Sequence, residues 1–261
     1  MTGLSKITPY IHRLVISFEN IYTTVFIIHT PTGVILFDTA TYESDADNYI
    51  LPSLQELGIA QDSLKCIVLS HSHRDHAGGL DRLAEFFPAA CIVSRSDALL
   101  KSFSDRQTLF PDAGSLLLGS VEMIPVPGHA PDCLALYDRR TRTLLTGDSL
   151  QLYGIYGSGK WGANISFPDE HLAAVGRLRA MDIELLVASH DYHPCGYIAR
   201  GPEEINRYLD CCGEALRKIR SFIFESPDSD DHTLADRYNQ TFGLPAVGTH
   251  VFTAIRNANF K

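Results

Sequence analysis

The chain has 261 residues, of which 45% are hydrophobic and 20% are charged, and its formal net charge is −9 at pH 7. This composition is that of an ordinary globular protein, and the length suits one large domain. The acidic balance argues against an extended nucleic-acid surface. The sequence contains no run of about 18 apolar residues, so no membrane span is predicted. The first 14 residues lack the order of a signal peptide, so we expect a cytoplasmic protein without a nucleic-acid or membrane partner.

The first half of the chain alternates short apolar runs with helical patterns. A turn at residues 30–33 separates two β-branched runs, which predicts a β-hairpin. Gly58 closes a helical stripe, Pro88 stops a second helix, and Ser96 can cap a third. The expected strands are residues 25–28, 34–37, 66–69 and 91–93, and the expected helices are 47–57, 80–87 and from 96 towards 103.

The second half repeats this alternation, which is typical of an α/β domain. Pro202, at a first helical position, opens a long helix with one apolar stripe. The expected strands are residues 121–126, 134–137, 144–145 and 184–188, and the expected helices are 169–181, 202–222 and 233–242. The tail beyond Gly243 has no predicted structure. No interdomain linker is visible, so we expect one domain over residues 1–261.

Five of the apolar runs end in a carboxylate or an imidazole. The residues that follow them are Asp38, His71, His129, Asp148 and His190. Because ligands of α/β proteins bind at strand ends, aligned strands would gather these groups at one edge of the sheets.

The densest cluster is His71-Ser72-His73-Arg74-Asp75-His76. In a tight loop, the first and third positions share one direction, while the fifth and sixth turn to another, so the side chains can face two metal ions. Imidazole nitrogens and a carboxylate oxygen suit divalent zinc, iron, manganese or cobalt. Gly78-Gly79 allows a sharp turn into the next helix. The sequence therefore predicts a metal site.

The motif His-x-His-x-Asp-His, after an apolar strand and before Gly-Gly-Leu, resembles the signature of the metallo-β-lactamase superfamily. Gly128-His129, Gly147-Asp148 and Ser189-His190 follow in the order that this superfamily shows. The resemblance covers a core of about residues 7–200 and leaves 202–261 as a helical extension. It implies a four-layer αββα sandwich with the metal site at the edge of two sheets.

The resemblance also implies a ligand set. His71, His73 and His129 would hold one metal ion, Asp75, His76 and His190 would hold a second, and Asp148 would bridge them. A hydroxide shared by two zinc ions, or by iron or manganese, would then attack a carbonyl or phosphoryl centre. Asp75 would also move the proton, and Asp38 would orient a ligand or cap its strand.

Departures of this sequence from the family pattern reduce the number of substrate classes that we expect. Asp148 stands where zinc β-lactamases generally have cysteine or serine, which disfavours antibiotic hydrolysis. His73 stands where flavin-linked di-iron relatives have glutamate. The ligand set is that of glyoxalase II-like thioesterases, but residues 147–154 lack the glutathione-binding pattern usual in those enzymes. Lactonases share the ligand set and often have a tyrosine near the site, a role for which Tyr153 and Tyr192 are candidates without being a clear match. Asp132 replaces a common glycine and would repel an anionic substrate, so we expect an ester, thioester or lactone.

Two other activities stay open at this stage. The first is a dioxygenase with a single iron, held by His71, His73, His129 and Asp148. The second is a phosphodiesterase or nuclease of the same superfamily, which the acidic balance disfavours. The six cysteines lack metal-ligand spacing and are expected to be free thiols. His193 and five other histidines outside the motifs are expected to have structural or surface roles. Tyr156 and Trp161 are further candidates for a substrate cleft. The oligomeric state is left open.

Overall fold

The computed structural model of the chain describes residues 3–156, 159–161, 164–242 and 246–260. The chain divides into two compact units. Unit 1 comprises Met1–Ile124 and Leu134–Thr141, and unit 2 comprises Pro125–Cys133 and Arg142–Lys261. Strands of the described residues form a seven-stranded sheet, a six-stranded sheet and a two-stranded ribbon. No helix in the described part is long and apolar enough to cross a lipid bilayer.

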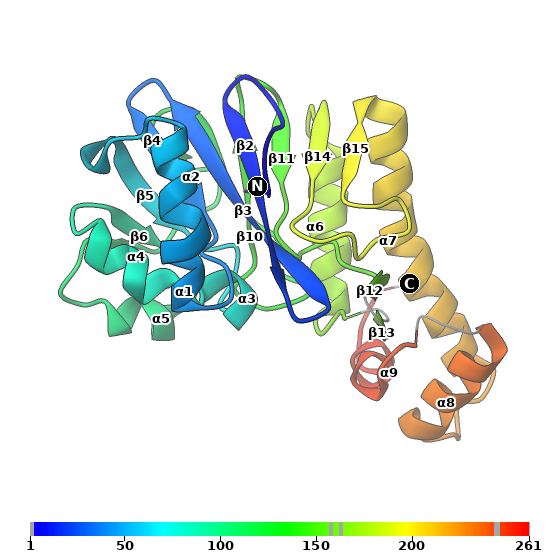
Figure 1. Ribbon diagram of the computed structural model, residues 1–261. Coiled ribbons are helices and arrows are strands. Elements are labelled where there is room, and N and C mark those ends of the chain that lie inside the picture. The colour runs from blue at the N-terminus through cyan, green and yellow to red at the C-terminus, as the bar shows by residue number, and fades with distance from the viewer. Residues whose placement is uncertain (1–2, 157–158, 162–163, 243–245, 261) are drawn as a thin grey trace. The chain divides into compact units, whose positions relative to one another are not determined.

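The seven-stranded sheet lies in unit 1, and its strands follow each other in chain order (Figure 1). The first four strands pair antiparallel, and the next three add in parallel. The parallel strands β4, β5 and β6 therefore present their carboxyl ends at the same edge. The strands are β1 (Gly3–Lys6), β2 (Ile11–Phe18), β3 (Ile21–Thr30), β4 (Gly33–Phe37), β5 (Leu64–Val68), β6 (Cys91–Val93) and β7 (Thr108–Leu109).

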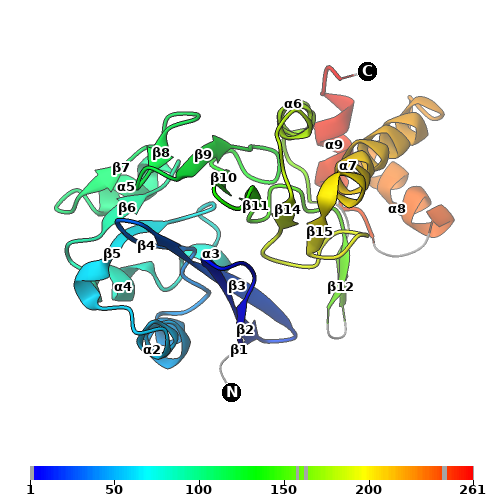
Figure 2. The ribbon, with the colours of Figure 1, turned by 90° about the horizontal axis from the view of Figure 1, so that it is seen from above.

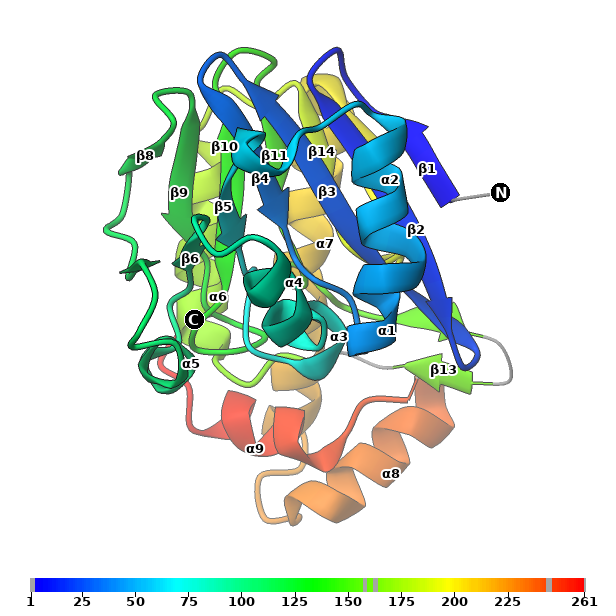
Figure 3. The same cartoon turned by 60° about the vertical axis from the view of Figure 1, so that its left-hand side comes forward.

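Helices of unit 1 cover one face of this sheet, as Figure 3 shows for α2 and α4. Leu54 and Leu83, from these two helices, belong to the same buried apolar cluster as Leu36 and Ile67 of the sheet. Burial of this cluster drives the packing of the helices on the sheet. The helical segments are α1 (Glu43–Asp45), the π-helical turn η1 (Ala46–Ile50), α2 (Leu51–Glu56), the 3₁₀ turn η2 (Gln61–Ser63), α3 (Arg74–Ala77), α4 (Leu80–Phe86) and α5 (Asp97–Ser102).

Strands of the six-stranded sheet occur in both units. Unit 1 contributes β8 (Leu116–Leu117), β9 (Val121–Pro125) apart from its last residue, and β10 (Leu134–Asp138). Unit 2 contributes β11 (Thr143–Leu145), β14 (Leu185–Val187) and β15 (Ile198–Arg200). Since β11 and β14 pair in parallel, they too have their carboxyl ends at a common edge.

Unit 2 is otherwise helical, and Figure 2 shows α6 and α7 beside β14 and β15. The long helix α7 buries a stripe that includes Leu209, Leu216 and Ile219, as its sequence predicts. The helices are α6 (Pro168–Arg179), α7 (Gly201–Phe224), α8 (Asp231–Phe242) and α9 (Thr249–Arg256), and the ribbon is β12 (Gly154–Tyr156) with β13 (Gly159–Trp161).

Each strand and helix expected from the sequence is present, with its ends shifted by a few residues. The predicted helix over 47–57 is wrong in detail, because helical structure starts at Glu43 and passes through a π-helical turn. The tail beyond Gly243, for which the sequence predicts no structure, contains α9. Seven strands are also not predicted from the sequence, and these are β1, β2, β7, β8, β12, β13 and β15.

Candidate metal centre

In unit 1, the end of β5 leads into the histidine-rich loop. Asp38 follows β4 and His71 comes three residues after β5, so the parallel pairing brings both residues to one edge of the sheet. The backbone amide of Asp38 donates to the carbonyl of Val68 at 2.8 Å, which extends this pairing past the end of β4. In unit 1, polar residues that follow apolar runs in the sequence thus lie together at the edge of the sheet, as expected.

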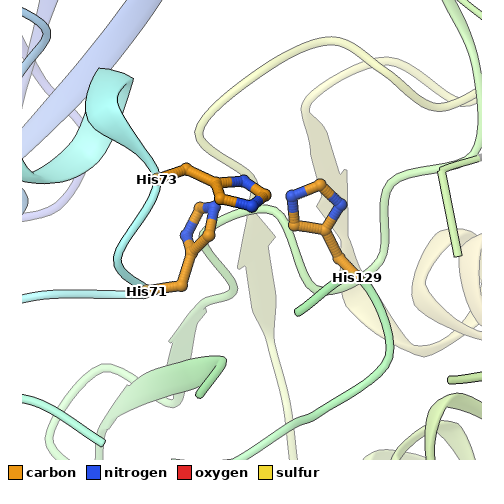
Figure 4. A group of neighbouring side chains, drawn as sticks. All are labelled: His71, His73 and His129. Carbon is orange, nitrogen blue, oxygen red and sulfur yellow. The ribbon is translucent and has the colours of Figure 1, made fainter. Parts of the chain in front are cut away.

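The imidazoles of the loop lie against one another. The ring centroid of His71 is 4.5 Å from that of His73 and 4.4 Å from that of His76, and Figure 4 shows His71 and His73. Asp75 and His76 lie on the short helix α3, and Nε2 of His76 is 3.4 Å from Oδ2 of Asp75. His71 and His76 are buried, whereas His73 is exposed and Asp75 is partly exposed.

Asp38 orients His76. Its Oδ2 lies 2.8 Å from Nδ1 of His76, and its Oδ1 accepts a hydrogen bond from the backbone amide of Ser70 at 2.6 Å. Burial raises the pKa of Asp38, and the neighbouring His76 and Ser70 act against this rise. With Nδ1 of His76 engaged by the carboxylate, Nε2 is the nitrogen available to a metal. The orienting role expected for Asp38 is thus supported, since its side chain contacts an imidazole of the motif.

Gly78 and Gly79 lie so close to neighbouring backbone that a side chain would not fit at either position. A Cβ atom on Gly78 would collide with the carbonyl oxygen of Thr41, and one on Gly79 would collide with that of Thr39. Gly78 has φ −68° and ψ −23°, which any residue can adopt. The expectation that glycine is needed here for a sharp turn is therefore wrong. The two glycines instead let residues 39–41 approach the loop closely.

In unit 2, β11 and β14 position two of the candidate ligands. Asp148 and His190 follow these parallel strands by three residues each. Oδ1 of Asp148 is 3.4 Å from Nε2 of His190, and Gln151 donates a hydrogen bond to Oδ2 of Asp148 at 2.9 Å. Both Asp148 and His190 are buried, so they are held in place with little contact to water.

His129 is oriented by the segment that precedes α6. Its Nδ1 lies 3.0 Å from the carbonyl oxygen of Asn164, and its Nε2 is 3.9 Å from Oδ2 of Asp148. A backbone carbonyl can only accept, so Nδ1 carries the proton and Nε2 is left for a metal. Ser166 and Phe167 donate backbone hydrogen bonds to the carbonyl of Gly128, which fix the same loop.

The tyrosines proposed for substrate contact differ in their surroundings. Tyr192 stacks on His190, with ring centroids 4.3 Å apart and an interplanar angle of 14°. Tyr153 is 37% exposed and follows Asp148 by five residues. The side chains of Tyr156 and Trp161 lie outside the described residues.

Two further residues singled out in the sequence are buried in unit 2. Asp132 is 7% exposed, three residues after His129. His193 stacks on Tyr208 at 3.5 Å between ring centroids, and its Nε2 lies 3.1 Å from the carbonyl oxygen of Tyr208. His193 therefore packs against α7, as expected of a structural residue.

Ser70, Gln151 and Asn164 support the candidate ligands but were not singled out in the sequence. Gln151 follows Asp148 by three residues, a spacing that could have suggested it. Asn164 is 35 residues from His129, and its contact is made through a backbone carbonyl, so no residue type marks it.

Known proteins share sequence and fold with this chain. A model of the metallo-β-lactamase superfamily matches residues 20–190. An uncharacterised protein, YobT, of Bacillus subtilis is 31% identical over 163 residues, which cover 53% of this chain and 67% of that one. A hydroxyacylglutathione hydrolase of Bartonella henselae is 29% identical over 168 residues, which cover 61% of this chain and 62% of the relative.

Among solved structures, the metal-soaked Flv1 flavodiiron core from Synechocystis sp. PCC6803 aligns with a TM-score of 0.64 at 19% identity. The alignment covers 82% of this chain and 61% of the flavodiiron chain. The chain therefore spans less than two thirds of this structure and of the Bartonella relative. This likeness shows a shared fold.

The chain belongs to the metallo-β-lactamase superfamily, and its fold is the α/β sandwich of that superfamily. This membership puts it among metal-dependent hydrolases, with a histidine and aspartate cluster suited to divalent metal ions.

Proposed function

We propose that the chain is a dinuclear metal-dependent hydrolase that cleaves an ester, thioester or lactone bond in a small molecule. The proposed site joins ligands from both units: His71, His73, Asp75 and His76 from unit 1, and His129, Asp148 and His190 from unit 2. The strongest support is the motif His-x-His-x-Asp-His of residues 71–76 in a chain that belongs to this superfamily.

The seven ligands are proposed to divide between two metal ions. His71, His73 and His129, the side chains drawn in Figure 4, would hold the first ion. Asp75, His76 and His190 would hold the second, and Asp148 would bridge the two. Within unit 2, the carboxylate oxygens of Asp148 lie 3.4 Å from Nε2 of His190 and 3.9 Å from Nε2 of His129, which supports its proposed bridging position.

The spacing of donor atoms within each unit suits a shared metal ion. Nε2 of His190 and Oδ1 of Asp148 are 3.4 Å apart, as are Nε2 of His76 and Oδ2 of Asp75. Two donors bound at about 2.0–2.2 Å to one tetrahedral ion lie roughly 3.3–3.6 Å apart. Nitrogen and oxygen donors without thiolates fit zinc, which we propose, and also iron or manganese.

When bound, two divalent ions would lower the pKa of water from 15.7 towards about 7 and stabilise negative charge developing on an acyl oxygen. The chain's own residues would do the rest. The carboxylate of Asp75 is 25% exposed, so it can receive the proton of the attacking water and pass it to the leaving group. Tyr153 is exposed and Tyr192 covers one face of His190, so both can contact the substrate.

An acyl substrate is favoured by the hydroxyacylglutathione hydrolase among the relatives. The buried carboxylate of Asp132, near His129, would disfavour an anionic group close to the reacting bond. A neutral or weakly charged ester, thioester or lactone fits both observations.

The proposal is tested by metal analysis and a substrate panel. The protein, purified without added metal and then loaded with zinc, iron or manganese, is assayed on esters, thioesters, lactones and phosphodiesters. Two metal ions per chain and hydrolysis of an acyl substrate are expected. A single iron with oxygen consumption, or hydrolysis of phosphodiesters alone, would contradict the proposal.

Variants separate the proposed roles. His76→Ala and Asp148→Ala are expected to lose metal and activity together, whereas Asp75→Asn is expected to reduce activity more than metal content. Asp81→Asn, on an exposed residue in the first turn of α4, and His232→Ala, on an exposed histidine of α8, are matched controls. They should change neither metal content nor activity.

A further inference from the structure

Three of the six cysteines lie near one another in unit 2. Cys195 is in the loop between β14 and β15, and Cys211 and Cys212 are on α7. The Sγ atoms of Cys195 and Cys211 are 3.9 Å apart, close enough for a thiol hydrogen bond. Cys212 instead lies with its Sγ 3.5 Å from the carbonyl oxygen of Tyr208, one helical turn before it on α7. Cys195 and Cys211 therefore form a pair, and Cys212 packs into the helix.

We propose that Cys195 and Cys211 are a site of reversible oxidation, at which a peroxide converts the two thiols into a disulfide bond. This inference is independent of the proposed hydrolase activity, because it depends only on contacts within unit 2.

Solvent reaches the pair from one side. Cys195 is partly exposed, whereas Cys211 is 7% exposed. A cavity of about 410 Å³ is lined by Cys195 together with Ile198, Glu203, Glu204 and Arg207. This volume accommodates a small peroxide, so the oxidant would meet Cys195 first.

Burial also distinguishes Cys211 from the partly exposed Cys195. Burial, followed by the neighbouring Cys195, raises the pKa of Cys211 to about 11, while the guanidinium of Arg207 acts in the opposite direction. Cys211 therefore stays protonated at neutral pH and can donate its hydrogen to Cys195. Cys195, the thiol that solvent reaches, would therefore be oxidised first.

The reaction balances with a peroxide as oxidant. The sulfur of Cys195 attacks one peroxide oxygen, the O–O bond breaks, and a sulfenic acid and one water or alcohol form. The sulfur of Cys211 then attacks the Cys195 sulfur, the S–O bond breaks, and the thiol proton leaves with hydroxide as water. The two sulfurs together lose two electrons, and the peroxide gains them.

Little movement is needed to form the bond. The sulfurs must approach from 3.9 Å to about 2.05 Å, a shift that rotation of the two side chains and a small loop movement can supply. Cys195 lies in a loop, so its backbone can follow, while α7 holds Cys211. The bond would close a short loop, which would stabilise the oxidised protein relative to the reduced one.

Cys66 and Cys91 provide a matched comparison. They are directly paired residues on the parallel strands β5 and β6, and burial raises the pKa of both thiols, that of Cys66 to about 12. Because two hydrogen-bonded strands hold their backbones, this pair is not expected to oxidise under the same conditions.

The test treats the full chain with one to five equivalents of hydrogen peroxide and counts free thiols after denaturation. The expected count falls from six to four and returns to six with dithiothreitol. Mass spectrometry of peptides cut without reduction should then find Cys195 linked to Cys211. Cys195→Ser and Cys211→Ser should each abolish this link, and Cys66→Ser should leave it unchanged.

Several outcomes would overturn the inference. These are six free thiols after treatment, a link between any other two cysteines, or oxidation of Cys195 to sulfinic acid without a disulfide. If Cys211→Ser fails to fold, Cys195→Ser serves alone, since Cys195 is partly exposed and lies in a loop.

Discussion

Oδ2 of Asp38 lies 2.8 Å from Nδ1 of His76, and both side chains are fully buried. The carboxylate also accepts a hydrogen bond from the amide of Ser70, so it is fixed on both oxygens. A carboxylate on one nitrogen of an imidazole selects its tautomer, fixes its ring and strengthens its other nitrogen as a metal ligand.

Asp38→Asn is expected to weaken metal binding by about 10–100-fold, the usual effect of losing such a support. Asparagine tolerates the φ of 70° that Asp38 adopts, so the change isolates the lost charge from backbone strain. Affinity is measured by competition with a chromogenic chelator. Asp47→Asn, which removes an exposed ion pair with Arg82, is the control. Equal affinity of the Asp38 variant and the parent would contradict the supporting role.

His71, His129, Asp148 and His190 could be singled out in the sequence because each closely follows an apolar run, whereas His73, Asp75 and His76 belong to the motif that begins at His71. A buried strand of an α/β domain needs continuous apolar residues, and a polar residue just past its end lies at the sheet edge. In each unit the structure confirms this placement for a parallel pair, β4 with β5 and β11 with β14. The ligand assignment across both units, the extent of the single domain and the cytoplasmic location stay predictions.

The supporting contacts were not predictable, because they depend on tertiary structure. Asn164 reaches His129 through its backbone carbonyl, which every residue type has. Helix α9 was missed since its eight residues offer only a short apolar pattern, and α9 buries Val251, Phe252 and Ile255. The edge strands β1 and β15 were missed because short strands that face solvent lack a continuous apolar run.

Gly78→Ala is expected to destabilise the protein by about 1–3 kcal/mol, because its Cβ would collide with the backbone of Thr41. Gly176→Ala is the matched control. Gly176 lies inside α6 with open space around it, so alanine there should stabilise by about 0.5–1 kcal/mol. Urea unfolding followed by circular dichroism measures both. Equal stability of the two variants would contradict the role of Gly78 in close packing.

His250→Ala is expected to weaken binding of one metal ion by up to about 10-fold. Nε2 of His250, in the first turn of α9, is 3.2 Å from Oδ1 of Asn164, whose carbonyl oxygen contacts His129. Loss of this contact should loosen the support of His129. Isothermal titration of the metal-free protein with zinc measures the effect for this variant and for His232→Ala. Identical titrations for both variants and the parent would show that α9 does not support the metal site.

The free energy of unfolding is expected to fall as the pH decreases below about 6.5, in part because of His193. Burial lowers the pKa of His193 from 6.5 to about 3. Between these two values the unfolded chain binds a proton that the folded chain does not, so acid favours unfolding. At pH 5 this residue alone should lower the free energy of unfolding by about 2 kcal/mol relative to pH 7.5.

His193→Gln tests this origin, because glutamine can hydrogen-bond the carbonyl of Tyr208 without titrating. Urea unfolding is measured from pH 5 to pH 7.5 for the parent, this variant and His232→Gln, which changes an exposed histidine. The His193 variant should have the shallower pH dependence, and the His232 variant should follow the parent. Parallel curves for all three proteins would assign the acid sensitivity to other buried groups, among them His171, whose pKa burial lowers to about 4.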